Sequence, residues 1–236
     1  MIPILMYHSI ESMPKSSVMR SLHVTPKSFY LQMSILNIFG FQGLSIKDLE
    51  PYLNGEKKGK VVGITFDDGY QNILVNAAPV LKKYNFTATC YIVSDLIGKF
   101  NSWDLENGIK QISLLSENDI NEWIKLGMHI GAHSKSHADL TSISELKAQC
   151  EISDCKISLE ENFKIKVTDF CYPYGKFNES VSKMVMDSGF QTATSMLRGR
   201  VNSKSDFYQL PRIPVNFRTH PLLFLAKILT SYEDKK

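Results

Sequence analysis

The sequence is poor in cysteine and lacks the patterns that cysteine usually forms. Its 236 residues contain four, Cys90, Cys150, Cys155 and Cys171, with neither a CxxC pair nor a zinc-ribbon spacing. This argues against a disulfide framework or a structural zinc site. Cys90 and Cys171 stand inside strand-like runs, where a cysteine is usually a small buried side chain. We therefore expect four reduced thiols, as in a cytoplasmic protein.

The sequence also lacks a long apolar run. The start, Met-Ile-Pro-Ile-Leu-Met-Tyr-His, has no basic residues ahead of its apolar stretch, which is too short for a signal peptide or a membrane span. If Met1 is the natural start, this predicts a cytoplasmic protein that does not use that export route. A trimmed N-terminus would give the same pattern.

No basic stripe, low-complexity linker or internal repeat is visible. The net charge is +3, but lysine and arginine are scattered and do not alternate with aromatic residues, so a nucleic-acid partner is not expected. A content of 43% hydrophobic residues over this length suits one sizeable core. We expect a single domain over residues 1–236.

Strand-like and helix-like segments alternate along the chain, which is typical of parallel strands joined by helices. Pattern alone fits both a doubly wound sheet and a barrel, and about seven units with polar groups at strand ends favour an α/β barrel. The predicted strands are Ile2–Tyr7, the Val61–Tyr70 run, Thr87–Val93, Met128–Ala132, Val167–Tyr172, Phe190–Thr194 and Tyr208–Ile213. The first predicted helix runs from Thr25-Pro26 to near Gly40. The others are Ser45–Leu53, Ile73–Tyr84, Glu117–Leu126, 142–163, Asn178–Ser188 and Pro221–Leu229, and a capping box of Ser142 and Glu145 is expected to open the helix over 142–163.

The Val61–Tyr70 run, Val-Val-Gly-Ile-Thr-Phe-Asp-Asp-Gly-Tyr, is a buried-strand pattern that ends in two carboxylates. Consecutive side chains on a strand point in opposite directions, so Asp67 and Asp68 can take different roles in one cleft. Gly69 allows a sharp turn after them. By itself, Asp-Asp-Gly is more often a polar turn in which one aspartate caps the next helix.

A second polar motif, His133-Ser-Lys-Ser-His137, places two imidazoles four residues apart. If they lie on one side of a turn, two imidazoles and one carboxylate form a three-ligand set with positions open for water and substrate. Asp68 is the natural third ligand. Alone, such a pair is more often a solvated polar turn; together with Asp67-Asp68 it favours a catalytic metal.

The pair of motifs, Thr65-Phe66-Asp67-Asp68-Gly69 and His133-Ser134-x-x-His137, resembles the polysaccharide deacetylases, the NodB-homology domain of carbohydrate esterase family 4. The resemblance extends from Met6-Tyr7-His8 to Leu210-Pro211-Arg212. It implies a distorted (β/α)7 barrel and metal-dependent removal of N-acetyl groups from amino sugars. By similarity, Asp67 is the general base, and Asp68, His133 and His137 hold the metal.

Two departures from the family pattern concern the other catalytic groups. Cys171-Tyr172-Pro173-Tyr174 matches Arg-x-Pro-Tyr except that Cys171 stands in place of the arginine that orients the base, so the Tyr174 N–H is the expected oxyanion donor. Arg212 could reach the carboxylate instead, or form a rim salt bridge.

The family's late Leu-x-His, which supplies the general acid, is also missing. His220, followed by Pro221, has the pattern of a helix start. Met-Tyr-His8 resembles the branch with poly-N-acetylglucosamine deacetylases, which implies that His8 protonates the leaving amine, an essential step because an amine anion leaves poorly. Otherwise His8 is a strand-end histidine with a hydrogen bond. We expect His23, His129 and His220 to be structural or surface groups.

Several aromatic residues could form a wall for a sugar ring beside Pro173. They are Trp103, Tyr70, Tyr172 and Tyr174, and core packing is the alternative for each, with Trp103 the best candidate because its loop lacks a periodic pattern. Leu222, Leu225, Ala226 and Leu229 form an apolar stripe of the last helix that is expected to pack on the barrel, with peripheral membrane contact as the alternative.

The resulting hypothesis is a metal-dependent deacetylase of an amino sugar in a polymer or on a lipid or nucleotide carrier. Zinc is the expected metal, and nickel, cobalt and manganese also suit two imidazoles and a carboxylate. Removal of a formyl group, or a non-catalytic carbohydrate-binding role, are the alternatives.

Overall fold

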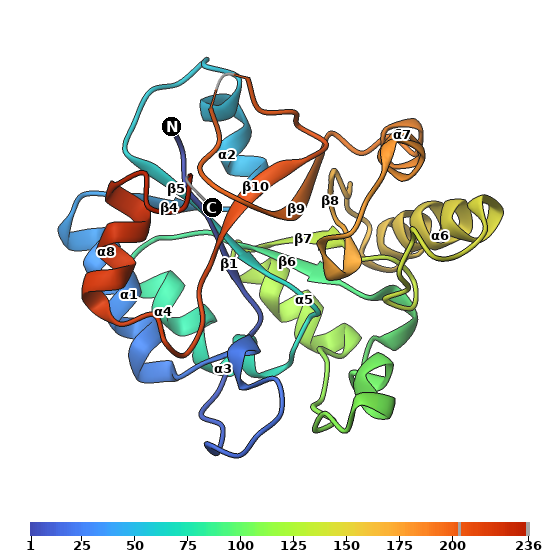
Figure 1. Ribbon diagram of the computed structural model, residues 1–236, viewed down its shortest axis with the longest axis horizontal. Helices are drawn as coiled ribbons and strands as arrows, with labels where there is room; N and C mark the ends of the chain where they lie inside the picture. Colours follow the sequence, from blue (N-terminus) through green and yellow to red (C-terminus); the bar gives the residue numbers. More distant parts are fainter. Residues whose placement is uncertain (203, 235–236) are drawn as a thin grey trace.

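Seven parallel strands close into a barrel in this computed structural model, which describes residues 1–202 and 204–234, except the side chains of residues 106 and 107. The order around the barrel is β1-β10-β9-β8-β7-β6-β5, and pairing of β1 with β5 closes it. The strands are β1 (Ile4–Tyr7), β5 (Val61–Phe66), β6 (Thr89–Ile92), β7 (His129–Ala132), β8 (Asp169–Cys171), β9 (Thr192–Arg198) and β10 (Leu210–Pro214). The predicted barrel is confirmed, and Figure 1 shows helices flanking it.

The barrel is distorted because β4 (Gln42–Leu44) shares an edge of β5 with β6. β4 pairs with the first half of β5, at Val61–Gly63, and β6 pairs with its second half, at Thr65 and Phe66. The register between β9 and β10 shifts at Leu210 and Arg212. The sequence analysis assigned no strand to β4, nor to the short pair β2 (Ser9–Ile10) and β3 (His23–Val24).

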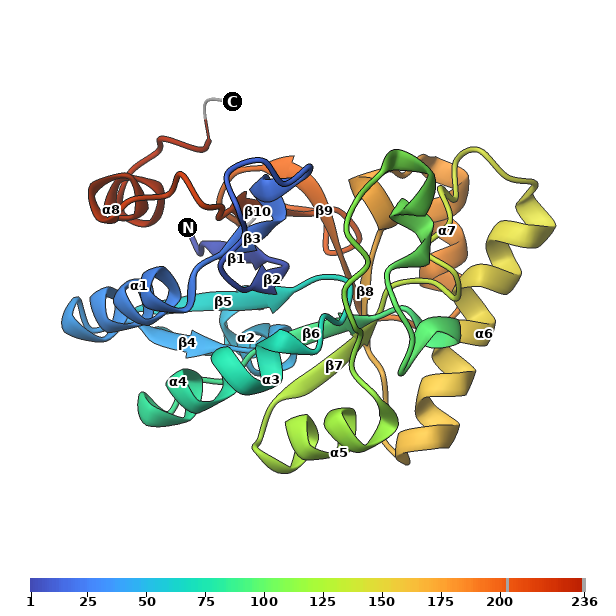
Figure 2. The same cartoon turned by 90° about the horizontal axis from the view of Figure 1, so that it is seen from below.

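Helices cover the outside of the barrel, with α1, α4 and α8 to one side and α6 and α7 to the other (Figures 1 and 2). They are α1 (Pro26–Ile38), α2 (Ile46–Leu53), α3 (Asn72–Asn76), α4 (Ala78–Lys83), α5 (Glu117–Lys125), α6 (Glu145–Phe163), α7 (Glu179–Asp187) and α8 (Pro221–Leu229). Short 3-10 segments are η1 (Arg20–Leu22), η2 (Ser94–Leu96), η3 (Ser102–Asn107) and η4 (Pro173–Gly175). Among the described residues, no helix combines the length and the apolarity that a membrane crossing requires.

Local sequence signals account for most helix ends. Thr25 caps α1 by accepting a hydrogen bond from the Ser28 N–H, and Pro26 occupies the first helical position, as predicted. The capping box predicted at Ser142 is wrong, because the Ser142 hydroxyl donates to the Asp139 carbonyl and α6 begins at Glu145. A capping box occurs instead at the start of α5, between Ser116 and Asp119.

The single helix predicted over Ile73–Tyr84 is also wrong. It is divided into α3 and α4 around Ala77. Pro79 explains the break, because proline lacks an N–H and its ring clashes with the carbonyl of the residue four positions earlier.

The apolar stripe of α8 that was predicted to pack on the barrel is confirmed only in part, because Leu225 packs against the core but two other members do not. Leu222 and Leu229 are 74% and 43% exposed, whereas Phe224 and Ile228 are buried. Lys227 lies on the same buried face, and its amine donates to the Pro214 carbonyl at 3.0 Å. This hydrogen bond holds α8 in a rotation that turns part of the leucine stripe toward solvent.

Candidate active site at the carboxyl ends of the strands

The two adjacent carboxylates lie where β5 ends, and the backbone turns them apart. Asp67 still follows the strand, with its N–H donating to the Tyr7 carbonyl at 2.9 Å. Asp68 and Gly69 both have left-handed conformations, with φ of 72° and 71°. A positive φ is unusual for aspartate and typical of functional sites that the surrounding fold holds in place. Both side chains are buried and, as expected, take different partners.

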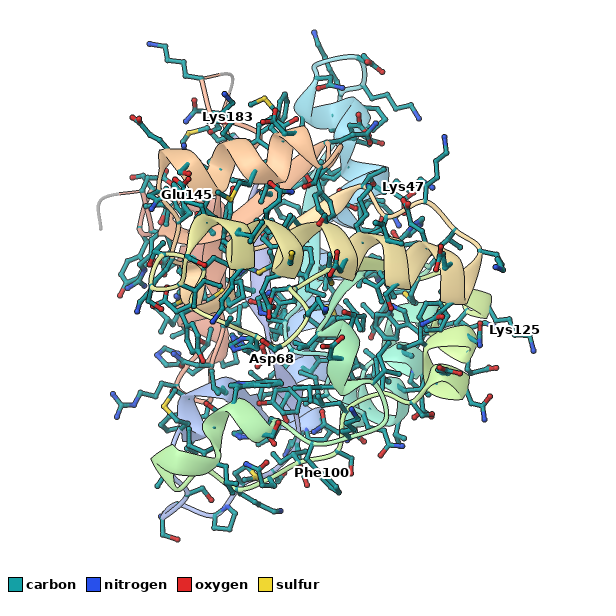
Figure 3. All side chains as sticks on the ribbon, turned by 90° about the vertical axis from the view of Figure 1, so that its right-hand side faces the viewer. Lys47, Asp68, Phe100, Lys125, Glu145 and Lys183 are labelled. Atoms are coloured by element: carbon teal, nitrogen blue, oxygen red, sulfur yellow. The ribbon has the colours of Figure 1, made fainter. Side chains whose placement is uncertain are left out.

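Asp68 points at two imidazoles. Its Oδ1 lies 3.3 Å from His133 Nε2 and 3.3 Å from His137 Nε2, and these ligand atoms all lie within 4.8 Å of one another. Figure 3 shows Asp68 well inside the molecule, between Phe100 of the loop before α5 and helix α6. The three predicted metal ligands are therefore brought together.

The hydrogen bonds around this cluster show that it suits a cation. His133 Nδ1 lies 2.7 Å from the Cys171 carbonyl, which only accepts, so Nδ1 carries a proton and Nε2 is directed at Asp68. Burial lowers the pKa of His137, whereas the contacts with Cys171 and Asp68 raise the pKa of His133 despite its burial. A cation between Asp68 and the two Nε2 atoms would take the place of the proton that His133 otherwise holds there. The donor set and the fixed ring of His133 thus fit a divalent metal.

Backbone strain is concentrated in the loop that carries the imidazoles. Ser134 and His137 have φ of 60° and 63°, and the His137 N–H donates to the Ser134 hydroxyl at 3.0 Å. This turn brings the two rings to an edge-on contact with centroids 4.8 Å apart. The conformation of this loop therefore orients both imidazoles.

Asp67 is held by Arg212, which reaches it from β10. Nη1 donates to Oδ1 at 2.7 Å and Nη2 to Oδ2 at 2.8 Å, and both side chains are buried. Burial alone would raise the pKa of Asp67, but the Arg212 charge holds it below its usual value. Of the two arrangements left open for Arg212, the structure shows the contact with Asp67 and not a rim salt bridge.

Cys171 leaves the space that this guanidinium needs. Arg212 Nη2 lies 3.3 Å from Cys171 Sγ, and Nε donates to the Ser195 carbonyl at 2.9 Å. Asp67, His133 and Cys171 also have ligand atoms close together, but there the Arg212 cation already pairs with Asp67. A metal ion is therefore better accommodated by Asp68, His133 and His137.

His8 and Tyr174 complete the polar part of the site. His8 Nε2 lies 3.9 Å from Asp67 Oδ2, just after β1. Tyr174 has a left-handed backbone, with φ of 57°, and its ring lies edge-on to His137 at 4.6 Å. Both residues line a cavity of about 350 Å³ with Asp67, Asp68 and the imidazoles.

The aromatic wall predicted for a sugar ring is smaller than expected. Trp103 stacks on His137, with centroids 4.4 Å apart, and Tyr174 is 45% exposed. Tyr172 borders the cavity, but its side chain is fully buried and its hydroxyl donates to the Tyr208 carbonyl. Tyr70 is buried as well. The rings of Tyr172 and Tyr70 therefore belong to the core.

The remaining predicted groups behave mainly as structural residues. Pro173 is buried in η4, ahead of Tyr174. His23 is buried against the Ser9 hydroxyl at 2.8 Å, and His220 caps α8, as its pattern indicated. His129 lies 3.5 Å from Asp48 at the start of β7.

Asp104 is a cavity residue that the sequence analysis did not select. It is 7% exposed, lines the cavity next to Trp103, and burial raises its pKa. Its position beside Trp103 in the unpatterned loop was the available signal. A larger cavity, about 390 Å³, lies at the opposite ends of β7 and β8, between Lys47, His129, Lys166 and Asp169, away from the imidazole pair.

Comparison with known proteins agrees with this geometry. The family model described as polysaccharide deacetylase matches residues 54–193, which include β5 with the acidic pair and the imidazole loop. The chain belongs to the polysaccharide deacetylase family. YxkH of Bacillus subtilis, whose name assigns it to the same family, is 32% identical over 217 residues, covering 91% of this chain and 71% of the relative.

Two other similar proteins carry more specific names. The poly-beta-1,6-N-acetyl-D-glucosamine N-deacetylase of Staphylococcus epidermidis is 29% identical over 216 residues, 85% of this chain and 71% of that protein. The deacetylase PplD of Streptococcus pyogenes, solved in complex with acetate, superposes with a TM-score of 0.84 at 25% identity and covers 96% of this chain and 97% of that one. This polysaccharide deacetylase therefore shares its fold over nearly its whole length with a solved deacetylase.

Proposed function

We propose that this polysaccharide deacetylase hydrolyses the acetamido group of N-acetylglucosamine units in a glycan, with a divalent metal held by Asp68, His133 and His137. The observation that carries the proposal is the buried contact of Asp68 with two imidazole Nε2 atoms at 3.3 Å, beside the separate Asp67–Arg212 pair. The name of the staphylococcal relative supports the choice of sugar.

The metal, when bound, supplies a Lewis acid for the amide carbonyl and lowers the pKa of a water molecule toward neutrality. Zinc suits this donor set, as do nickel, cobalt and manganese. Asp68, His133 and His137, which would hold the metal, line the same cavity as Trp103 and Tyr174, where the acetamido group would enter.

Asp67 is the proposed general base. Since Arg212 keeps its pKa low, Asp67 stays ionised at neutral pH and accepts the proton of the attacking water. The two hydrogen bonds from Arg212 also fix the direction of the Asp67 carboxylate. Arg212 would thus take the role of the arginine that other members of the family have at the position of Cys171.

His8 is the proposed general acid, and Tyr174 the proposed oxyanion donor. His8 lies on the open side of Asp67, at 3.9 Å, where it can protonate the amine nitrogen as the C–N bond breaks. Tyr174 lines the cavity with a left-handed backbone, and its N–H would stabilise the negative charge on the carbonyl oxygen. Trp103 would stack on the sugar ring.

Acetate release from β-1,6-linked N-acetylglucosamine oligomers tests this function. We expect release that stops when the protein is stripped of metal by a chelator and returns when Zn²⁺ is added. His133→Ala should abolish both metal binding and release, whereas His129→Ala, which removes a histidine at the other end of β7, should change neither. Acetate release that does not depend on metal, or no acetate release by the metal-loaded protein, would contradict the proposal. Release of formate from the N-formyl analogue, without release of acetate from the N-acetyl oligomer, would support a deformylase.

A further inference from the structure

The arginines of the chain fall into two groups. Of the five, three pair with a carboxylate, as Arg198 with Glu233, Arg200 with Asp234 and Arg212 with Asp67. The other two, Arg20 and Arg218, contact the same ring: their guanidinium carbons lie 4.3 Å and 5.2 Å from the centroid of Phe217.

These two arginines adjoin, in sequence, residues that line the catalytic cavity. Arg20 begins η1, and its neighbours Met19 and Ser21 both line the cavity. Arg218 follows β10, two residues after Asn216, which lines it too. The contact of Arg20 with Phe217 joins the loop between β2 and β3 to the segment that follows β10, so residues far apart in sequence come together here. We call Arg20, Phe217 and Arg218 the arginine rim.

The arginine rim has charge without a partner. Within residues 1–202 and 204–234, neither guanidinium makes an ion pair or a hydrogen bond, and each lies over the ring of Phe217. A contact with a ring face holds a guanidinium in place but leaves its five N–H donors unused. Two neighbouring cations also repel each other, so an anion between or beside them would be favoured.

The cavity centre is unsuited to that anion. Asp67, Asp68 and Asp104 line its interior, and their carboxyl groups would repel a second negative group there. The arginine rim does not line the cavity itself but follows Met19 and Asn216, which do. An elongated substrate can therefore place a neutral acetamido sugar in the centre and an anionic neighbour at the rim.

We propose that the arginine rim binds a phosphodiester or carboxylate group that the glycan carries next to the N-acetylated sugar. This inference rests on the proposed function, since it assigns a substrate class to the same site. Planar guanidinium groups match the oxygens of both anions by paired hydrogen bonds. The preferred substrate class is accordingly an anionic glycan.

The test compares three oligomers of equal length: neutral N-acetylglucosamine, one with a methyl phosphodiester on the neighbouring sugar, and one with a uronic acid there. We expect kcat/KM at low salt to be at least about tenfold higher for one of the anionic oligomers. Arg20→Gln with Arg218→Gln should remove this preference through KM and leave the neutral oligomer within about twofold. Lys47→Gln with Lys166→Gln, which removes two positive charges at the opposite end of the barrel, is the matched control and should keep the preference.

The outcomes separate this proposal from the proposed function. Equal kcat/KM for all three oligomers, or a preference that the double variant keeps, would overturn the arginine rim while leaving the deacetylase intact. If no oligomer is turned over, binding of the anionic oligomers to the protein by calorimetry still decides, because only the wild type should bind them more tightly than the neutral one. Sedimentation with phosphatidylglycerol vesicles that depends on both arginines, without any oligomer preference, would assign the rim to a lipid headgroup and contradict the proposal.

Discussion

Arg212 donates two hydrogen bonds, of 2.7 Å and 2.8 Å, to the carboxylate of Asp67, although the two residues are 145 positions apart in the chain. Nη1 also donates to the Thr65 hydroxyl at 3.1 Å, which joins β10 to β5 below the acidic pair. This contact fixes both the position and the charge state of the proposed base. It also explains how the site can be complete with Cys171 where the family has arginine.

Removing Arg212 should weaken both catalysis and stability. We expect Arg212→Gln to lower kcat/KM by about a hundredfold or more and to cost about 3–5 kcal/mol of unfolding free energy, because Asp67 becomes a buried charge without its partner. Burial would then raise the pKa of Asp67, so the acidic limb of the pH–rate profile should move to higher pH. Steady-state kinetics from pH 4 to 9 and urea unfolding measure these effects.

Arg212→Lys serves as the control for charge. Lysine keeps the positive charge but cannot make both hydrogen bonds, so we expect partial recovery of stability and little recovery of rate. Full activity in Arg212→Lys would show that the paired geometry is unimportant.

The two aspartates should separate into a base and a metal ligand. Asp67→Asn is expected to keep the metal and lose at least about a hundredfold in kcat, since an amide cannot accept the proton. Asp68→Asn should bind the metal more weakly than wild type, and its activity should fall for that reason. Metal content after dialysis, measured with the rate, distinguishes them; loss of the metal in Asp67→Asn would contradict the assignment.

His8 should act on turnover and not on folding. It is partly exposed beside Asp67, so His8→Ala should leave the unfolding temperature nearly unchanged while lowering kcat by about a hundredfold. With a substrate that has a better leaving group, such as an acetylated aniline, the leaving nitrogen needs less protonation, so His8→Ala should lower kcat much less. Near-normal kcat on the sugar substrate would remove His8 from the mechanism.

The buried carboxyl group of Asp169 should make the free energy of unfolding depend on pH, independently of catalysis. Burial raises its pKa to about 6, although the Thr192 and Thr168 hydroxyls donate to it. The folded protein therefore holds this proton more tightly than the unfolded chain, so its contribution to stability is present below pH 4 and is lost as the pH rises through 6. A difference of about two pKa units corresponds to about 3 kcal/mol.

Asp169→Asn should remove this part of the pH dependence. Urea unfolding at pH 4.5 and pH 7.5 measures it, and the variant should gain stability relative to wild type at the higher pH. Equal pH dependence in both proteins would show that Asp169 is already ionised in the folded state.

Sequence patterns predicted those features of the site that depend on interactions between residues close together in the chain. The run from Val61 to Asp67 and the His133–His137 spacing identified the acidic pair and the imidazoles, because side-chain periodicity and a tight turn are set within a few residues. The single-domain extent of residues 1–236 stays a prediction, as do the catalytic roles.

Contacts between distant segments could not be read in the same way. Nothing near Arg212 specifies that β10 lies where its guanidinium reaches Asp67, and nothing near Tyr172 specifies that Tyr208 accepts its hydroxyl. The break before Pro79 was predictable from the proline alone, whereas the orientation of α8 depends on Lys227 reaching Pro214.

An anomalous-difference map of crystals soaked with Zn²⁺ tests the central claim most directly. The account predicts one strong peak about 2.0–2.2 Å from an Asp68 oxygen and from the Nε2 atoms of His133 and His137, with Asp67 still paired to Arg212. A peak on Asp67 and Cys171 instead, or no peak within bonding distance of both imidazoles, would contradict it.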